Sequence, residues 1–251
     1  MVQNAFVEAN LKLIADEVAR SLSFAEISGR SAFITTPVTY ANGTAVVVRL
    51  DEDDDGYFVS DDGYGAFTAE TMGALQTFVK VAGGVAKRGG VNFDQRAFFI
   101  IRVDRDRLPA AVAAIANVSA AAVERTIYAL ESMKVKRSKV LFQARLEEAF
   151  GNKAKFDQPV RGATREWDFA GVIQDENGIA AVFEFVAPAF SAVAAANMKI
   201  GDVRGLTDAP SAIVALADYD KTEPSLRAIL SNTADKVIAV TTAATEYRLA
   251  A

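Results

Sequence analysis

The stretch that decides the fold of the C-terminal half is WDFAGVIQDENGIAAVFEFVA, residues 167–187. It predicts two β-strands joined by a polar turn, with Asp168 on the first and Glu184 near the middle of the second. Side chains alternate between the faces of a strand, so Glu184 shares a face with Val182 and Val186. A carboxylate in an apolar strand is costly unless a metal, a proton or a cation compensates it. We therefore expect the two acids to converge on one solvent-reachable hollow.

The segments around this hairpin predict a mixed α/β region. A helix is expected near 139–150 and a strand near 155–161, both before the hairpin. After it come a helix near 190–200, a buried strand over 211–219, a helix from Pro224 and a final strand over 236–243. The order of the first six of these elements is α-β-β-β-α-β, with the acids on the second and third strands.

This order, with acids in those places, resembles the core of the restriction-endonuclease-like superfamily of metal-dependent nucleases. The resemblance covers roughly residues 138–251 and implies that Asp168 and Glu184 bind a divalent metal such as Mg²⁺. It also implies that Glu147 or Glu148, on the preceding helix, supplies the extra acid that some members use. The chemistry is consistent, because adjacent carboxylates hold a hard cation that activates water and neutralises charge on a phosphate.

One position departs from the superfamily pattern. The lysine expected two residues after the second acid is replaced by Val186, which can neither bind phosphate nor polarise water. Some members carry this cation on the following helix, where Lys199 is the candidate. The resemblance therefore leaves open whether the core is an active nuclease, with Asp168, Glu184 and Lys199 as catalytic residues, or a degenerate core kept for binding. A third interpretation is that both acids are structural.

The N-terminal region predicts a small α+β module. An amphipathic helix opens the chain, and strands are expected over 32–40, 44–53 and 57–63, with an Asn42-Gly43 turn between the first two. Helical spacing follows over 66–82, and a strand over 91–103. The S-D-D-G motif at Ser60–Gly63 resembles a bacterial and prophage module of unknown function, which implies a phage or mobile-element context.

The S-D-D-G motif has two interpretations. In the structural one, its side chains accept hydrogen bonds from the amides of the next helix, and Gly63 adopts a positive φ. In the functional one, Asp61 and Asp62 form a cation site with the acidic run Asp51–Asp55. That run lacks the spacing of a calcium-binding loop and predicts a solvated hairpin tip.

The segment from Pro109 to Met133 is alanine-rich, with apolar residues at helical spacing, and predicts one or two connecting helices. Its small residues also suit a close helix–helix interface, which keeps a homodimer open. We therefore expect a mixed α+β chain with an acidic module over 1–104, a helical connector over 105–137 and a nuclease-like core over 138–251.

The composition excludes several classes of site. The chain has neither cysteine nor histidine, which removes disulfides, thiol nucleophiles, structural zinc and Ser-His-Asp triads. Any metal must be hard and oxygen-bound, and the alternative is no cofactor at all. No apolar run approaches the ~18–20 residues needed to cross a bilayer, and the N-terminus lacks secretory features. We expect a cytoplasmic protein without membrane partners.

The charge is distributed unevenly. Residues 1–104 hold 9 Lys and Arg against 14 Asp and Glu, whereas the remainder holds 18 of each. Within the remainder, residues 134–165 carry 9 basic side chains against 3 acidic ones. This segment is either a phosphate-facing surface or a solvated helix face. The candidate nucleic-acid-binding residues are Lys136, Arg137, Lys139, Lys153, Lys155, Arg161 and Arg165.

Three functions follow from these features. The first expectation is a phage-type or mobile-element-type protein that associates with nucleic acid through a degenerate nuclease-like core. The second is an active Mg²⁺-dependent nuclease. The third is an acidic inhibitor that covers a basic surface of a host defence protein. Whether the chain is an enzyme stays open at this level.

Overall fold

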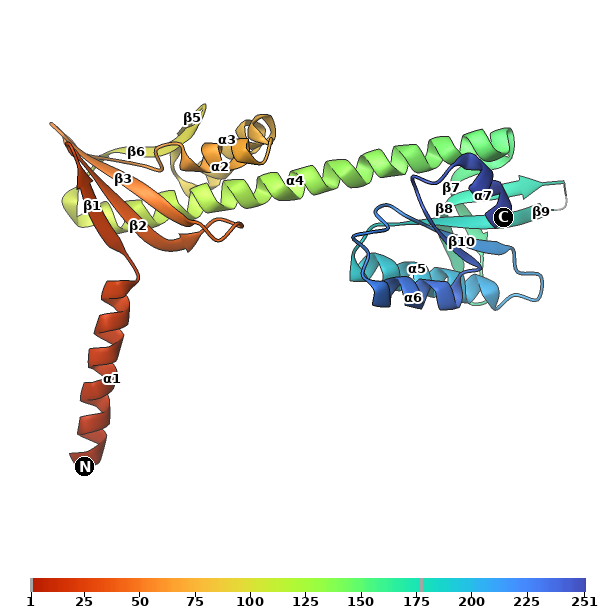
Figure 1. Cartoon of the computed structure of the whole chain (residues 1–251), viewed down its shortest axis with the longest axis horizontal. Coiled ribbons are helices and arrows are strands. Elements are labelled where there is room, and N and C mark those ends of the chain that lie inside the picture. Colours follow the sequence, from red (N-terminus) through yellow and green to blue (C-terminus); the bar gives the residue numbers. More distant parts are fainter. Residues whose placement is uncertain (1, 177) are drawn as a thin grey trace. The chain divides into compact units, whose positions relative to one another are not determined.

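The computed structural model describes residues 2–176 and 178–251, with the side chains of residues 2–10 excepted. The chain is a mixed α/β protein with two separate sheets (Figure 1). It divides into two compact units, Met1–Glu131 and Ser132–Ala251, and the boundary between them falls inside one long helix, α4. The expected mixed class is confirmed at this level.

The N-terminal unit contains a six-stranded antiparallel sheet in the order β1-β2-β3-β4-β6-β5. The three expected strands are confirmed as β2, β3 and β4, whereas the edge strand β1 was not expected. In chain order the elements are α1 (Val2–Ser21), β1 (Phe24–Ser28), β2 (Ser31–Thr39), β3 (Ala45–Asp53), β4 (Gly56–Ser60), α2 (Tyr64–Thr71), α3 (Leu75–Gly89), β5 (Asn92–Asp94), β6 (Ala97–Val103), a 3-10 turn (Arg105–Arg107) and the start of α4 (Leu108–Phe150).

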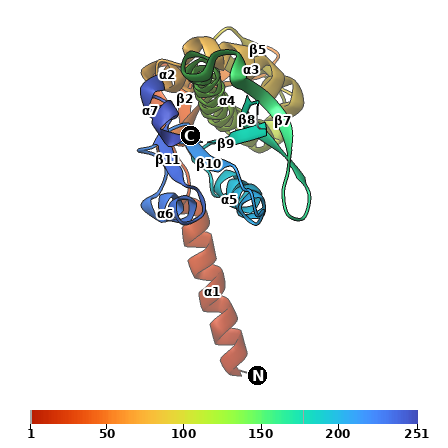
Figure 2. The ribbon, with the colours of Figure 1, turned by 90° about the vertical axis from the view of Figure 1, so that its right-hand side faces the viewer.

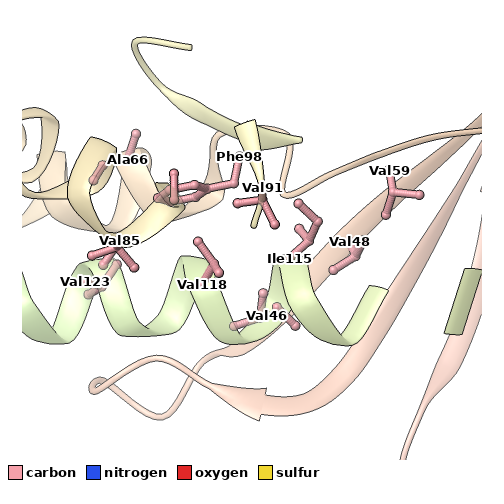
Figure 3. Close-up of a cluster of buried hydrophobic side chains, with 14 of the residues drawn as sticks. Val46, Val48, Val59, Ala66, Val85, Val91, Phe98, Ile115, Val118 and Val123 are labelled. Atoms are coloured by element: carbon pink, nitrogen blue, oxygen red, sulfur yellow. The ribbon is translucent and has the colours of Figure 1, made fainter. Parts of the chain in front are cut away.

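The core of this unit lies between the sheet and its helices (Figure 3). Strand residues Val46, Val48 and Val59 pack with Val85 of α3 and Ile115 of α4. All five are buried, because each belongs to the apolar face of its element. The six-stranded sheet is thereby covered by α2, α3 and the first part of α4.

Helix α4 corrects the expected connector. Instead of a connector over 105–137 and a separate helix near 139–150, one helix runs over Leu108–Phe150. Pro109 lies in its first turn, neither Gly nor Pro follows until Gly151, and Gly151 ends the helix with φ 58.

Among the described residues, only the segment Arg105–Lys153 is long and apolar enough to span a membrane by length and composition. Its first part lies in the core of the N-terminal unit, which accounts for this apolar composition.

Two further expectations are corrected by residues with positive φ. The helix expected over 66–82 is divided into α2 and α3, because Gly73 adopts φ 67 and ends the first helix. The strand expected over 91–103 is a hairpin of β5 and β6, with Gln95 at φ 45 in the turn. The spacing of apolar residues along the sequence does not change at the break between α2 and α3 or at the turn between β5 and β6.

The C-terminal unit contains a five-stranded sheet in the order β11-β10-β9-β8-β7. Strands β7, β8 and β9 form an antiparallel meander, and β9, β10 and β11 run parallel. After α4 the elements are a 3-10 turn (Gly151–Lys153), β7 (Ala154–Arg161), β8 (Glu166–Asp175), β9 (Gly178–Val186), α5 (Phe190–Arg204), β10 (Ser211–Leu216), α6 (Pro224–Thr233), β11 (Lys236–Ala239) and α7 (Ala244–Ala250). Only α7 was not expected.

Helices cover both faces of this sheet (Figure 2). Val182 and Val186 of β9 pack with α5 and α6 in one cluster, whereas Phe183 packs with Phe142 of α4 and Tyr247 of α7 in another. The predicted alternation along β9 is therefore confirmed. It places Glu184 on the α5 face, in an otherwise apolar layer.

Candidate active site

The candidate site lies where strands β8 and β9 separate. Their ladder runs from the turn to the Gly171–Phe183 pair and does not continue to Ala170 and Glu184. The N–H of Ala170 instead donates to Oε2 of Glu184, at 3.4 Å. The carboxylate of Glu184 thus accepts a backbone N–H of β8 just beyond the last pair of the ladder.

Glu184 is the buried acid of the site. Only 9% of the residue is exposed, and Lys199 of α5 places its Nζ 2.7 Å from Oε1. Burial raises the pKa of Glu184, and the hydrogen bond and positive charge of Lys199 oppose that rise without cancelling it. Lys199 also donates to the backbone carbonyl of Asp168 at 2.8 Å. One lysine therefore links both acid-bearing strands.

Asp168 and Glu184 line the same cavity. Its volume is about 240 Å³, and its walls are formed by Lys139, Asp157, Asp168, Ala170, Glu184, Phe185 and Lys199. Asp168 is exposed, and its carboxylate makes no hydrogen bond or ion pair within the described part of the chain. The structure therefore brings together the three predicted catalytic residues, with one carboxylate engaged and the other accessible.

The structure does not bring Glu147 to this cavity, which corrects the expected metal set. Leu146 and Ala149 face the core of the C-terminal unit, so Glu147 and Glu148 turn toward solvent on the other side of α4. Glu148 pairs there with Arg145 at 2.7 Å. The third acid at the cavity is Asp157 of β7, which was not predicted as a site residue.

The carboxylates of Asp168 and Glu184 suit a hard cation whose remaining ligands are water molecules and phosphate oxygens. Among the residues that the structure describes, no group of three or more acidic side chains is arranged to hold a metal. Mg²⁺ does not require such a group, because it is commonly held by one or two carboxylates and completed by water and phosphate oxygens. Asp168 and Glu184 are the residues that would hold it here.

The seven predicted binding residues do not line one cavity. Lys139 lines the site cavity, whereas Lys153 and Lys155 line a separate hollow of about 610 Å³ with Gln174 and Asp175. The remaining residues are exposed and line neither cavity: Lys136, Arg137, Arg161 and Arg165.

Arg165 stacks on an aromatic side chain beside the site. Its guanidinium lies 4.4 Å from the ring centre of Trp167, and the indole Nε1 donates to Oδ2 of Asp202 at 2.8 Å. Asp202 also accepts the backbone N–H of Thr164, and these hydrogen bonds, led by that of Trp167, lower its pKa. The loop before β8 is therefore fastened to α5, and Arg165 is held three residues before Asp168.

The S-D-D-G motif is structural. Asp61 is fully buried, and its two oxygens accept the N–H groups of Gly63, Gly65 and Phe98 and the hydroxyl of Ser119. Gly63 adopts the expected positive φ of 78°.

The proposed cation site around this motif is not formed. Asp62 and Asp51 both pair with Arg49, at 3.1 and 2.9 Å, and Asp61 has no free oxygen. The acids that remain, Glu52 to Asp55, lie exposed at the end of β3 and in the β3–β4 turn. The expected hairpin tip is confirmed.

Comparison of the chain with known protein families, with curated proteins and with solved structures found no match.

Proposed function

We propose that the C-terminal unit is a metal-dependent nuclease. The observation that carries this proposal is the lysine of α5 beside the buried acid of β9, at a cavity that the acid of β8 also lines. The order of elements around it, from the end of α4 through β7, β8, β9 and α5 to β10, is the order that the restriction-endonuclease-like resemblance implies. The site and its scaffold support the same chemistry.

The position of Lys199 favours an active enzyme over a degenerate one. A degenerate core is suggested by Val186, which occupies the usual lysine position. Val186 is buried against the α5 layer, and α5 itself delivers an ammonium group to the acid two residues earlier. The cation needed beside the acids is therefore present, although it comes from a different element.

The residues have distinct parts in this proposal. A bound Mg²⁺ supplies Lewis acidity and lowers the pKa of a coordinated water. Asp168 and Glu184 would hold the cation, and Lys199 would orient the attacking water and offset the charge that grows on the scissile phosphate. The partial burial of the site strengthens these interactions, because charges interact more strongly where water is excluded.

The raised pKa of Glu184 predicts a pH dependence. Burial makes this carboxylate bind protons at higher pH than an exposed glutamate does, and a protonated Glu184 cannot hold a cation. Cleavage should therefore fall as pH is lowered through this raised pKa, before exposed glutamates titrate near about 4.3. A pH–rate profile at Mg²⁺ well below saturation measures this fall, because saturating cation would itself keep Glu184 deprotonated. A rate that is constant down to that range would contradict the assignment.

Nucleic-acid association without cleavage is the second candidate, and the stacked Arg165 favours it. Arg165→Ala should raise the Kd for a labelled oligonucleotide about five- to tenfold at low salt and reduce the salt slope by about 1, as expected for a lost phosphate contact. Arg227→Ala is a matched control, because Arg227 stacks at 4.5 Å on Tyr219 and lies outside the site cavity. Equal effects of the two substitutions would count against a specific binding surface at Arg165.

The third expectation, an acidic inhibitor of a host defence protein, stays a prediction for the N-terminal unit. Its surface acids are partly compensated, since Arg49 pairs with both Asp51 and Asp62.

A further inference from the structure

An ion pair forms part of the cavity wall beside the proposed catalytic residues. Lys139 of α4 places its Nζ 3.1 Å from Oδ1 of Asp157 on β7. Both residues line the cavity that also holds Asp168, Glu184 and Lys199. Lys139 is close enough for its charge to contribute to lowering the pKa of Glu184, although less than Lys199 does. The site thus has two lysines, one from each helix layer.

The two lysines differ in how firmly they are held. The Lys199–Glu184 pair is largely buried, with side-chain exposures of 22% and 11%, and Lys199 has a second acceptor in the carbonyl of Asp168. The Lys139–Asp157 pair is open to solvent, with exposures of 42% and 63%. Exposed ion pairs contribute little to stability, so Lys139 can exchange Asp157 for another anion at small cost.

Asp157 has an unusual backbone conformation within its strand. Asp157 lies inside β7 with φ 48, and it is the one residue other than glycine with positive φ among the described residues of the C-terminal unit. Its neighbours Phe156 and Gln158 keep regular pairing with β8. A single left-handed residue in a strand is unfavourable for an L side chain. The surrounding ladder therefore holds Asp157 in its position opposite Lys139.

We propose that Lys139 binds a phosphate of the nucleic-acid backbone at the site and that Asp157 competes with that phosphate for it. The inference rests on the proposed nuclease function and names the residue that holds the substrate. An ammonium group at the mouth of the cavity matches a phosphate oxygen, since charge-assisted hydrogen bonds of this kind are short and strong. Asp157 keeps the lysine in place when substrate is absent and opposes binding through its own negative charge.

This arrangement predicts opposite effects for the two partners. Lys139→Gln should raise the Kd for a single-stranded or duplex oligonucleotide at least about fivefold and reduce the salt slope by about 1. Asp157→Asn should lower the Kd about threefold or more, because it removes the competitor and a repulsive charge. The double variant should lose most of the gain that Asp157→Asn gives alone, since the competition acts through Lys139 and only the loss of the repulsive charge remains.

The experiment uses the full chain carrying Glu184→Gln, so that substrate is bound without being cut. Fluorescence anisotropy with labelled 20-nucleotide DNA and RNA gives the Kd values, and circular dichroism checks that each variant is folded. Asp220→Asn removes the same charge from an exposed position outside the cavity and is the matched control.

The outcomes separate this inference from the proposed function. A Kd for Asp157→Asn that is unchanged, raised or equal to that of Asp220→Asn overturns the competition, and an unchanged Kd for Lys139→Gln overturns the phosphate assignment. Either result leaves the nuclease proposal standing if the wild-type chain cleaves nucleic acid with Mg²⁺. If the chain carrying Glu184→Gln alone binds no oligonucleotide and the wild-type chain cleaves none, the proposed function fails. The proposed role of Lys139 then fails with it.

Discussion

Replacing Lys199 by methionine is expected to lower Mg²⁺-dependent cleavage about a thousandfold, the range found when an electrostatic group at a reacting centre is removed. Methionine preserves the length and the apolar stem of the side chain but removes the ammonium that contacts Oε1 of Glu184 and the carbonyl of Asp168. The pKa of Glu184 should rise further, because burial would act without the opposing charge. Cleavage rates across pH measure both effects.

Lys221→Met is the matched control for this substitution. Lys221 is exposed, belongs to the same unit and does not line the cavity, so its removal should leave the rate within about twofold, as expected for a surface change far from the chemistry. Thermal unfolding separates a catalytic loss from a loss of folded protein. A Lys199→Met variant that is folded and retains the wild-type rate would remove Lys199 from the proposed machinery.

Asp61→Ala is expected to destabilise the N-terminal unit by about 3–5 kcal/mol, since it strips the partners from several buried polar groups at once. The substitution leaves the N–H groups of Gly63, Gly65 and Phe98 without their acceptor. It also leaves the hydroxyl of Ser119, which is fully buried, without its carboxylate partner. Denaturant unfolding followed by circular dichroism measures the change.

The neighbouring Asp62 provides the control for this prediction. Its side chain is 40% exposed and pairs with Arg49, and its backbone has a φ of 49, which asparagine tolerates better than alanine. Asp62→Asn should therefore cost within about 1 kcal/mol, as the loss of a surface ion pair generally does. Similar destabilisation by the two substitutions would show that the S-D-D-G motif is not organised around Asp61.

The hairpin that carries the two acids could be predicted from the sequence, because its signals are local. Strict alternation placed Glu184 on the face of Val182 and Val186, and the polar run between the strands marked the turn. The hydrogen bonds from the N–H groups of Gly63 and Gly65 to Asp61 could be predicted as well, because these residues are close in sequence. The further contacts of Asp61 could not, since Phe98 and Ser119 lie 37 and 58 residues away along the chain. Only the packed sheet and α4 bring them to the carboxylate.

The remainder of the site depends on tertiary structure. Lys199 was suggested by the resemblance alone, because one lysine in a helix has no local pattern that directs it to a strand 15 residues earlier. Asp157 was missed because its place at the cavity depends on a left-handed backbone inside a strand, which the sequence around it does not mark. Glu147 was wrongly expected there because the spacing of Leu146 and Ala149 sets the rotation of α4 only once the sheet is in place.

The most direct test of the central claim is cleavage of plasmid DNA, single-stranded DNA and RNA by the purified full chain with Mg²⁺ or with EDTA. Glu184→Gln and Asp168→Asn are assayed in parallel, because each removes one carboxylate charge and preserves the shape of its side chain. The account predicts Mg²⁺-dependent cleavage of at least one substrate by the wild type, and its loss in both variants. No cleavage with Mg²⁺ or Mn²⁺, or cleavage that persists in Glu184→Gln, would contradict it.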